Sequence, residues 1–180
     1  MIKNVIFDFD GVIVDSEVIV AKSINKYLNT KGIEFEEKEF YELAGNKTVE
    51  VISILCSKYK ISNEKKFYND IMQISENLYK YELKAITGVI EFLKTTNYFR
   101  LIGSNNIKER IVSGLKSLDL LKFFDENFIF TFDLVGIPKP EPDIYLRALQ
   151  SSKIDISETV IIEDSSIGTK AGVSAGIRVI

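Results

Sequence analysis

The feature that most constrains this fold is an apolar run at residues 5–7, Val-Ile-Phe, which ends in two carboxylates and a glycine. Such a run is typical of a strand that is buried on both faces, as in a parallel sheet. Asp8 and Asp10 are two residues apart, so their side chains emerge on the same side where the strand opens into a loop. Two like charges so close favour a cation between them, and oxygen ligands indicate Mg²⁺. The alternative is an ordinary polar turn with Gly11 as its pivot.

Composition narrows the possible classes of protein. A chain of 180 residues, 46% hydrophobic and 27% charged, can bury one core and carry one modest inserted domain. No apolar run reaches the length of a membrane span, and the first strand begins too early for a signal peptide, so we expect a cytoplasmic protein. The net charge of −3 without a basic cluster predicts a small-molecule partner, not a nucleic acid or a membrane, and we expect a monomer.

Two residue types restrict the chemistry. The absence of histidine excludes Ser/His triads, Cys/His dyads and the usual His-containing zinc sites, so acid and base roles fall to carboxylates, Lys or Tyr. The single cysteine, Cys56, lies in an apolar helical pattern, which indicates a buried and unreactive thiol.

The periodicity of apolar residues changes near residue 85. Residues 17–84 show helical spacing without a convincing strand, which predicts an inserted α-helical domain. From residue 86 onward, strands and helices alternate, which predicts a parallel sheet with helices on both faces. The expected fold is therefore α/β and Rossmann-like, with a core domain of residues 1–16 and 85–180.

Polar residues follow three later strands, as the aspartates follow the first. Ser104 and Asn105 come after a strand at residues 99–102, and Glu163 and Asp164 come after a strand at residues 159–162. Lys139 comes after a strand at residues 128–131, in a stiff loop that contains the three prolines of the chain. Each has an ordinary alternative: Ser104 as a helix cap, and the two acids as a charged strand end with a cap. Together they place acids, a hydroxyl and a lysine at one edge of the sheet.

The stretches DFDGVIVDSE, LIGSNN, KPEPDIY and VIIEDSSIG, in this order, resemble the four motifs of the haloacid dehalogenase superfamily, in its β-phosphoglucomutase-like phosphatase and mutase branch. The resemblance implies that Asp8 is the nucleophile, which forms an aspartyl-phosphate, and that Asp10 is the general acid and base. It implies two further groups, the phosphate ligands Ser104, Asn105 and Lys139, and the Mg²⁺ ligands Asp8, Asp10, Glu163 and Asp164.

The helical insertion, residues 17–84, resembles the cap domain of that superfamily, which closes over the substrate. Within it, the loop containing Gly45, Asn46 and Lys47 places small and polar residues with one cation between two helices. These residues are candidates for substrate contact, and a plain turn is the equal alternative.

The function that follows is hydrolysis of a small phosphate monoester, such as a sugar phosphate or similar metabolite, by a Mg²⁺-dependent phosphatase. Asp10 argues against the superfamily's dehalogenases and phosphonatases, which the resemblance implies lack a second aspartate. A β-phosphoglucomutase-type hexose-phosphate mutase would share every residue named. A third alternative, from another class, is an inactive binder of a small molecule or protein that keeps a truncated fold.

The sequence ends at Ile180, inside an expected fifth strand at residues 177–180. Members of the superfamily usually continue into a final helix, so we expect either a short protein or a truncated one. That strand should lie at one edge of the sheet, where an uncovered edge would lower stability or promote association.

Overall fold

The computed structural model describes residues 1–43 and 48–180, which form two compact units. The first unit contains Met1–Asp15 and Lys84–Ile180, and the second contains Ser16–Leu83. The chain therefore leaves the first unit once and returns to it once. These two crossings lie beside each other, because the Asp15 N–H donates to the Lys84 carbonyl at 2.9 Å.

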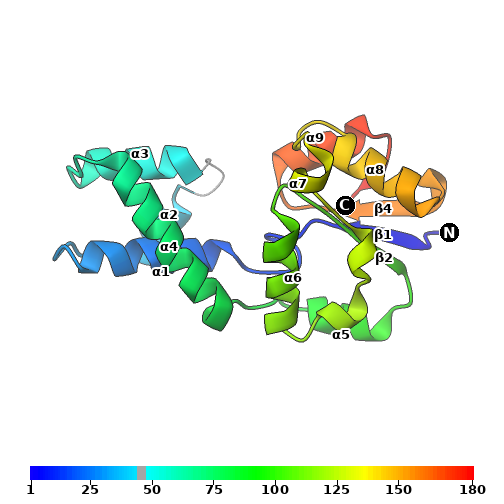
Figure 1. Ribbon diagram of the computed structural model, residues 1–180, viewed down its shortest axis with the longest axis horizontal. Coiled ribbons are helices and arrows are strands. Elements are labelled where there is room, and N and C mark those ends of the chain that lie inside the picture. Colours follow the sequence, from blue (N-terminus) through cyan, green and yellow to red (C-terminus); the bar gives the residue numbers. More distant parts are fainter. Residues whose placement is uncertain (44–47) are drawn as a thin grey trace. The chain divides into compact units, whose positions relative to one another are not determined.

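A parallel five-stranded sheet forms the centre of the first unit, in the order β3-β2-β1-β4-β5 (Figure 1). Its strands are β1 Asn4–Phe7, β2 Phe99–Ser104, β3 Ile129–Thr131, β4 Thr159–Ile162 and β5 Arg178–Val179. The α/β prediction is confirmed, and β5 lies at an edge beside β4, as expected.

Helices cover both faces of this sheet, with α5 and α6 on one side and α8 and α9 on the other (Figure 1). The helices of the first unit are α5 Val89–Thr95, α6 Lys108–Ser117, α7 Phe132–Val135, α8 Asp143–Ser152 and α9 Ser166–Ser174, with 3₁₀ turns at Leu121–Phe123, Glu126–Phe128 and Ile156–Glu158. The short helix α7 was not expected, because its four residues offer too little periodicity to distinguish it from a loop.

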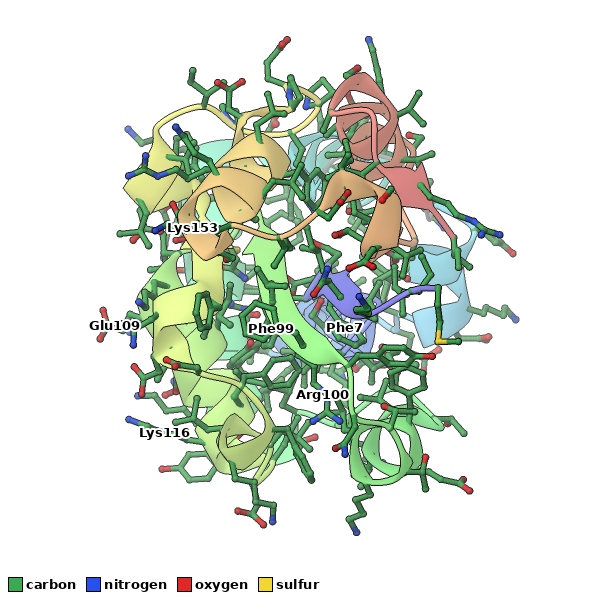
Figure 2. The ribbon with its side chains drawn as sticks, turned by 90° about the vertical axis from the view of Figure 1, so that its right-hand side faces the viewer. Phe7, Phe99, Arg100, Glu109, Lys116 and Lys153 are labelled. Atoms are coloured by element: carbon green, nitrogen blue, oxygen red, sulfur yellow. The ribbon has the colours of Figure 1, made fainter. Side chains whose placement is uncertain are left out.

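The continuous apolar run of β1 is explained by burial on both faces. On one face, the Phe7 ring makes edge-to-face contacts with Phe92 and Phe124, at centroid distances of 6.1 and 5.9 Å. On the other face, Ile6 belongs to a buried cluster with residues of α8 and α9, among them Tyr145. Figure 2 shows Phe7 on β1 next to β2, which carries Phe99, while Glu109 and Lys116 of α6 point away from the sheet. If one face of β1 were polar, the helices on that side of the sheet would have no apolar surface of the strand to pack against.

The register of the sheet aligns the ends of its central strands. Phe7 is paired with Ile102 on β2 and with Ile162 on β4. The residues that follow, Asp8 and Glu163 among them, therefore emerge side by side at the carboxyl edge. This is the edge where parallel α/β sheets bind their ligands.

The second unit is helical and has its own core. Its helices are α1 Glu17–Asn29, α2 Glu37–Tyr41, α3 Thr48–Lys58 and α4 Glu64–Glu82. Buried Phe67 and Cys56 belong to one cluster, which confirms that this thiol is buried, and burial raises its pKa. The predicted substrate-contact residues Gly45, Asn46 and Lys47 lie outside the described residues. Within the described ranges, no helix combines the length and the apolarity needed to cross a bilayer.

Candidate active site

A tight turn carries the chain from β1 into the site. The Asp8 N–H donates to the Ile162 carbonyl of β4 at 2.9 Å, which continues the ladder by one residue. Gly11 follows with φ +81°, and its N–H donates to the Val14 carbonyl at 2.8 Å. Gly11 is therefore the pivot of a turn, because a left-handed backbone favours glycine. It also lies against the acid at the end of β4, because an added Cβ would lie 1.9 Å from Asp164 Oδ2.

Lys139 joins the first and the last predicted motif. Its Nζ donates to Asp8 Oδ1 at 2.7 Å and to Glu163 Oε2 at 2.6 Å. Lys139 is 5% exposed and Asp8 is 8% exposed, so this ion pair is withdrawn from bulk water. A buried carboxylate pair would repel strongly without a cation between its members, which explains why the lysine lies there.

Glu163 is bound through both of its carboxylate oxygens. Its Oε2 accepts from Lys139 and also from the Tyr145 hydroxyl at 2.7 Å. Its Oε1 accepts from the Ser165 N–H at 3.2 Å and from the Ser165 hydroxyl at 2.8 Å. Ser165 in turn caps α9, because its Oγ accepts from the Gly168 N–H at 3.0 Å. The alternative interpretation of Glu163 and Asp164 was a charged strand end followed by a helix cap. Ser165 is that cap, at the start of α9.

Asn105 binds the backbone of the lysine loop. The Lys139 N–H donates to Asn105 Oδ1 at 2.7 Å, and Asn105 Nδ2 donates to the Lys139 carbonyl at 3.2 Å. Asn105, which was predicted to bind phosphate, thus holds the backbone of Lys139, another predicted phosphate ligand. Lys139 precedes a cis bond to Pro140.

Ser104 is buried at the end of β2, and its Oγ accepts from the Asn106 N–H at 3.1 Å. It does not cap the next helix: α6 has Ile107 at its N-cap position, and the Lys108 N–H donates instead to Asp133 Oδ1 at 3.2 Å. The helix-cap interpretation of Ser104 is therefore wrong, because the chain runs three further residues before α6 begins.

Two residues of the site were missed by the sequence analysis. Asn106 Nδ2 donates to Asp10 Oδ2 at 3.0 Å, and the Tyr145 hydroxyl reaches Glu163. Asn106 follows the predicted pair Ser104 and Asn105 directly, so a polar triplet at the strand end was the available signal. Tyr145 carried no such signal, because an aromatic residue on the buried stripe of α8 is what a core requires.

Burial sets the charge states of the site. It raises the pKa of Asp8 to about 7, with Glu163 and Asp10 acting in the same direction and Lys139 opposing them. Burial and the negative charge of Glu163 also raise the pKa of Asp164. For Glu163, burial is outweighed by the charge of Lys139 and by hydrogen bonds, so its pKa is lowered. Burial, followed by the charge of Glu163, raises the pKa of Tyr145 far above its usual range, which keeps its hydroxyl a donor.

The acids at this edge fit a small divalent cation. Among the described residues, Asp8, Glu163 and Asp164 each offer a carboxylate oxygen, and these atoms lie within 4.8 Å of one another. A set of hard oxygen donors suits Mg²⁺. The carboxylate of Asp10, the fourth predicted ligand, is not part of this group and accepts from Asn106. Glu163 is also less available than Asp164, because four donors already occupy its oxygens.

Comparisons with known proteins identify the family of this chain. The family model for haloacid dehalogenase-like hydrolases matches residues 5–180. The 6-phosphogluconate phosphatase of Escherichia coli strain K12 is 26% identical over 180 residues, which span 99% of this chain and 81% of that protein. The phosphorylated carbohydrates phosphatase of Thermotoga maritima is 29% identical over 181 residues, which span 98% of this chain and 82% of that protein.

A solved structure shares both units. The crystal structure of a HAD family hydrolase from Deinococcus radiodurans, with bound phosphate and sodium, matches with a TM-score of 0.83 and 28% identity. The match covers 99% of this chain and 79% of that one.

Proposed function

This chain belongs to the haloacid dehalogenase-like hydrolases, and from that membership we propose that it is a Mg²⁺-dependent phosphatase of a small phosphate monoester. The observation that carries the proposal is the buried Lys139 ammonium between Asp8 and Glu163, two acids whose carboxylate oxygens lie within 4.8 Å of an oxygen of Asp164. With Mg²⁺ bound among these acids, Lys139 and the metal together would neutralise a dianionic phosphoryl group, whose transfer depends mainly on positioning and neutralisation of charge. The names of the two similar phosphatases favour a sugar phosphate or a related metabolite as the substrate.

In the proposed reaction, a carboxylate oxygen of Asp8 attacks phosphorus and the bond from phosphorus to the ester oxygen breaks. Asp10 donates its proton to the leaving oxygen, so the alcohol departs neutral. Water then attacks the aspartyl-phosphate, Asp10 accepts a proton from that water, and inorganic phosphate is released with Asp8 restored. A carboxylate nucleophile replaces one difficult displacement with two easier ones.

The positions of these side chains support the roles proposed for them. Asp8 directly follows β1 and is held by the ladder to β4, which makes it the more rigid of the two aspartates. Asp10 lies one step into the turn, where Asn106 holds its carboxylate. Lys139 and Ser104 would bind the phosphoryl oxygens, and Asn105 fixes the lysine loop.

Asp8 and Asp164, with Glu163 as the less available third donor, would hold the metal. The bound ion would add positive charge against the phosphoryl oxygens and would favour the ionised form of Asp8. Without Mg²⁺, Lys139 is the one cation that the described residues place between these acids.

The proposal is tested by phosphate release from a panel of sugar phosphates and other monoesters, with and without Mg²⁺. Asp8→Asn should abolish turnover while the circular dichroism spectrum stays unchanged, because an amide cannot attack phosphorus yet has the shape of the carboxylate. Asp70→Asn is the matched control, because Asp70 lies in the second unit and pairs with Lys66 at 2.7 Å.

Full turnover by a folded Asp8→Asn protein would disprove the assignment of the nucleophile. A trace of hexose bisphosphate should be included in one arm. Isomerisation of a hexose phosphate without release of phosphate would show that the protein is a mutase, because a mutase needs such a bisphosphate as its intermediate.

A further inference from the structure

Tyr145 of α8 lies between two charged groups of the site. Its hydroxyl donates to Glu163 Oε2 at 2.7 Å, and Lys139 Nζ is 4.8 Å from the centre of its ring. Lys139 donates to the same Glu163 oxygen at 2.6 Å. The three side chains therefore form a closed set in which each one contacts the other two.

The place of the ring is set by the sheet. Tyr145 is fully buried, and an added Cβ on Gly103 of β2 would lie 2.9 Å from its Cε1 atom. The ring therefore lies directly against the backbone of the residue that precedes Ser104. A side chain enclosed in this way cannot change rotamer without moving β2 or α8, so its hydroxyl is a fixed donor.

Glu163 is enclosed as tightly. Its side chain has no exposed surface, and an added Cβ on Gly168 would lie 1.9 Å from its Oε2 atom. Ser165 occupies its other oxygen. The Glu163 carboxylate therefore has one orientation in which Oε2 accepts from Lys139. The hydrogen bond from the Tyr145 hydroxyl to the same oxygen helps to hold that orientation.

Lysine needs such support because its chain has four rotatable bonds, and holding its ammonium at one point costs side-chain entropy. We propose that Tyr145 is a positioning residue, which holds Lys139 at the phosphate position through Glu163. This inference rests on the proposed function for the role of Lys139 toward phosphate. It differs from a packing role, because it assigns the effect to one hydroxyl group and routes it through one carboxylate.

The test is a double-mutant cycle on the full chain with Mg²⁺ present, read out as the affinity for inorganic phosphate by isothermal titration calorimetry. Tyr145→Phe keeps the ring and removes the hydroxyl, and it should raise the Kd for phosphate about tenfold, as losses of supporting hydrogen bonds do at other sites. In a Glu163→Gln background the same change should alter the Kd by less than about twofold, because the carboxylate that transmits it is gone. Additive effects would mean that the Tyr145 hydroxyl does not act through Glu163, and would overturn the inference.

The matched control is Tyr79→Phe, which removes the hydroxyl of a buried tyrosine in the second unit and should leave the phosphate affinity unchanged. If Tyr145→Phe does not fold, Ser165→Ala loosens the same carboxylate from its other oxygen and must show the same dependence on Glu163.

Crystal structures of the wild-type protein and of Tyr145→Phe provide a readout that needs no ligand. The lysine Nζ should leave its present position, 2.7 Å from Asp8 Oδ1 and 2.6 Å from Glu163 Oε2. An unmoved lysine together with unchanged phosphate affinity would disprove the positioning role. A wild-type protein that neither binds phosphate nor hydrolyses any ester would refute the proposed function instead, and the position of Lys139 in the variant would then decide the inference.

Discussion

The backbone of Gly11 lies so close to the carboxylate of Asp164 that a Cβ on Gly11 would be 1.9 Å from Oδ2. The turn after β1 and the end of β4 therefore fit together only without a side chain at this position. The glycine that gives the turn its left-handed backbone also makes room for one of the acids proposed to bind the metal.

Gly11→Ala should therefore weaken Mg²⁺ binding as well as stability. The left-handed backbone costs alanine about 1 kcal/mol of folding free energy, and displacement of Asp164 should raise the Kd for Mg²⁺ about tenfold or more. Gly136→Ala is the matched control, because Gly136 has φ +83° and no atom within 4 Å of an added Cβ. Thermal unfolding and calorimetric Mg²⁺ titration measure both effects. Equal Mg²⁺ affinities in the two variants would contradict the prediction.

The raised pKa of Asp8 predicts the pH dependence of stability without metal. Its folded-state pKa is about 7 against an ordinary value of 3.8, so the folded protein binds this proton more tightly than the unfolded chain does. The contribution of Asp8 is therefore fully present below about pH 4 and is lost as the pH rises toward 7. Asp8→Asn removes this dependence, so the variant should gain about 1–3 kcal/mol relative to the wild type between pH 4 and pH 8.

Urea unfolding in EDTA at several pH values measures that gain, with Asp70→Asn as the control. A difference between Asp8→Asn and the wild type that is constant across this range would show that Asp8 is ionised throughout it.

Removal of the metal should stop turnover reversibly. EDTA should abolish phosphate release and added Mg²⁺ should restore it, because the acids at the sheet edge would otherwise repel the phosphoryl group. Asp164→Ala should weaken Mg²⁺ binding far more than Ser104→Ala does, since a hydroxyl at the end of β2 would contact phosphate and not the metal. Full activity after exhaustive chelation would show that the acidic group is not a Mg²⁺ site.

Asn105 should stabilise the lysine loop more than it binds phosphate. Asn105→Ala removes both hydrogen bonds to the Lys139 backbone, which should lower the free energy of unfolding by about 1–2 kcal/mol and also reduce kcat/KM. Asn127→Ala is the control, because its amide donates to exposed Asp125 away from the site. Lost turnover with unchanged stability would instead indicate that Asn105 contacts the substrate.

The sequence by itself determined the fold class and the edge of the sheet where polar residues gather. The apolar run before Asp8 and the one before Glu163 could be recognised because a strand buried on both faces needs a continuous apolar run, which is visible in the local sequence. A parallel sheet then brings the carboxyl ends of its strands to one edge. The roles of Asp8, Asp10 and Asp164, and those of the undescribed residues Gly45, Asn46 and Lys47, stay predictions.

Only the tertiary structure decided which side chains contact one another at that edge. Lys139 and Glu163 are 24 residues apart, and nothing in their local sequence assigns the lysine to that carboxylate. Tyr145 has the pattern of a core residue, and the hydroxyl it presents to Glu163 depends on how α8 packs against β2. The sequence predicts Asn105 as a phosphate ligand, yet both polar atoms of its side chain form hydrogen bonds with the backbone of Lys139, in a loop that follows a different strand. Such contacts depend on distances of a few ångströms between elements, which the packing of the core sets and local sequence patterns do not.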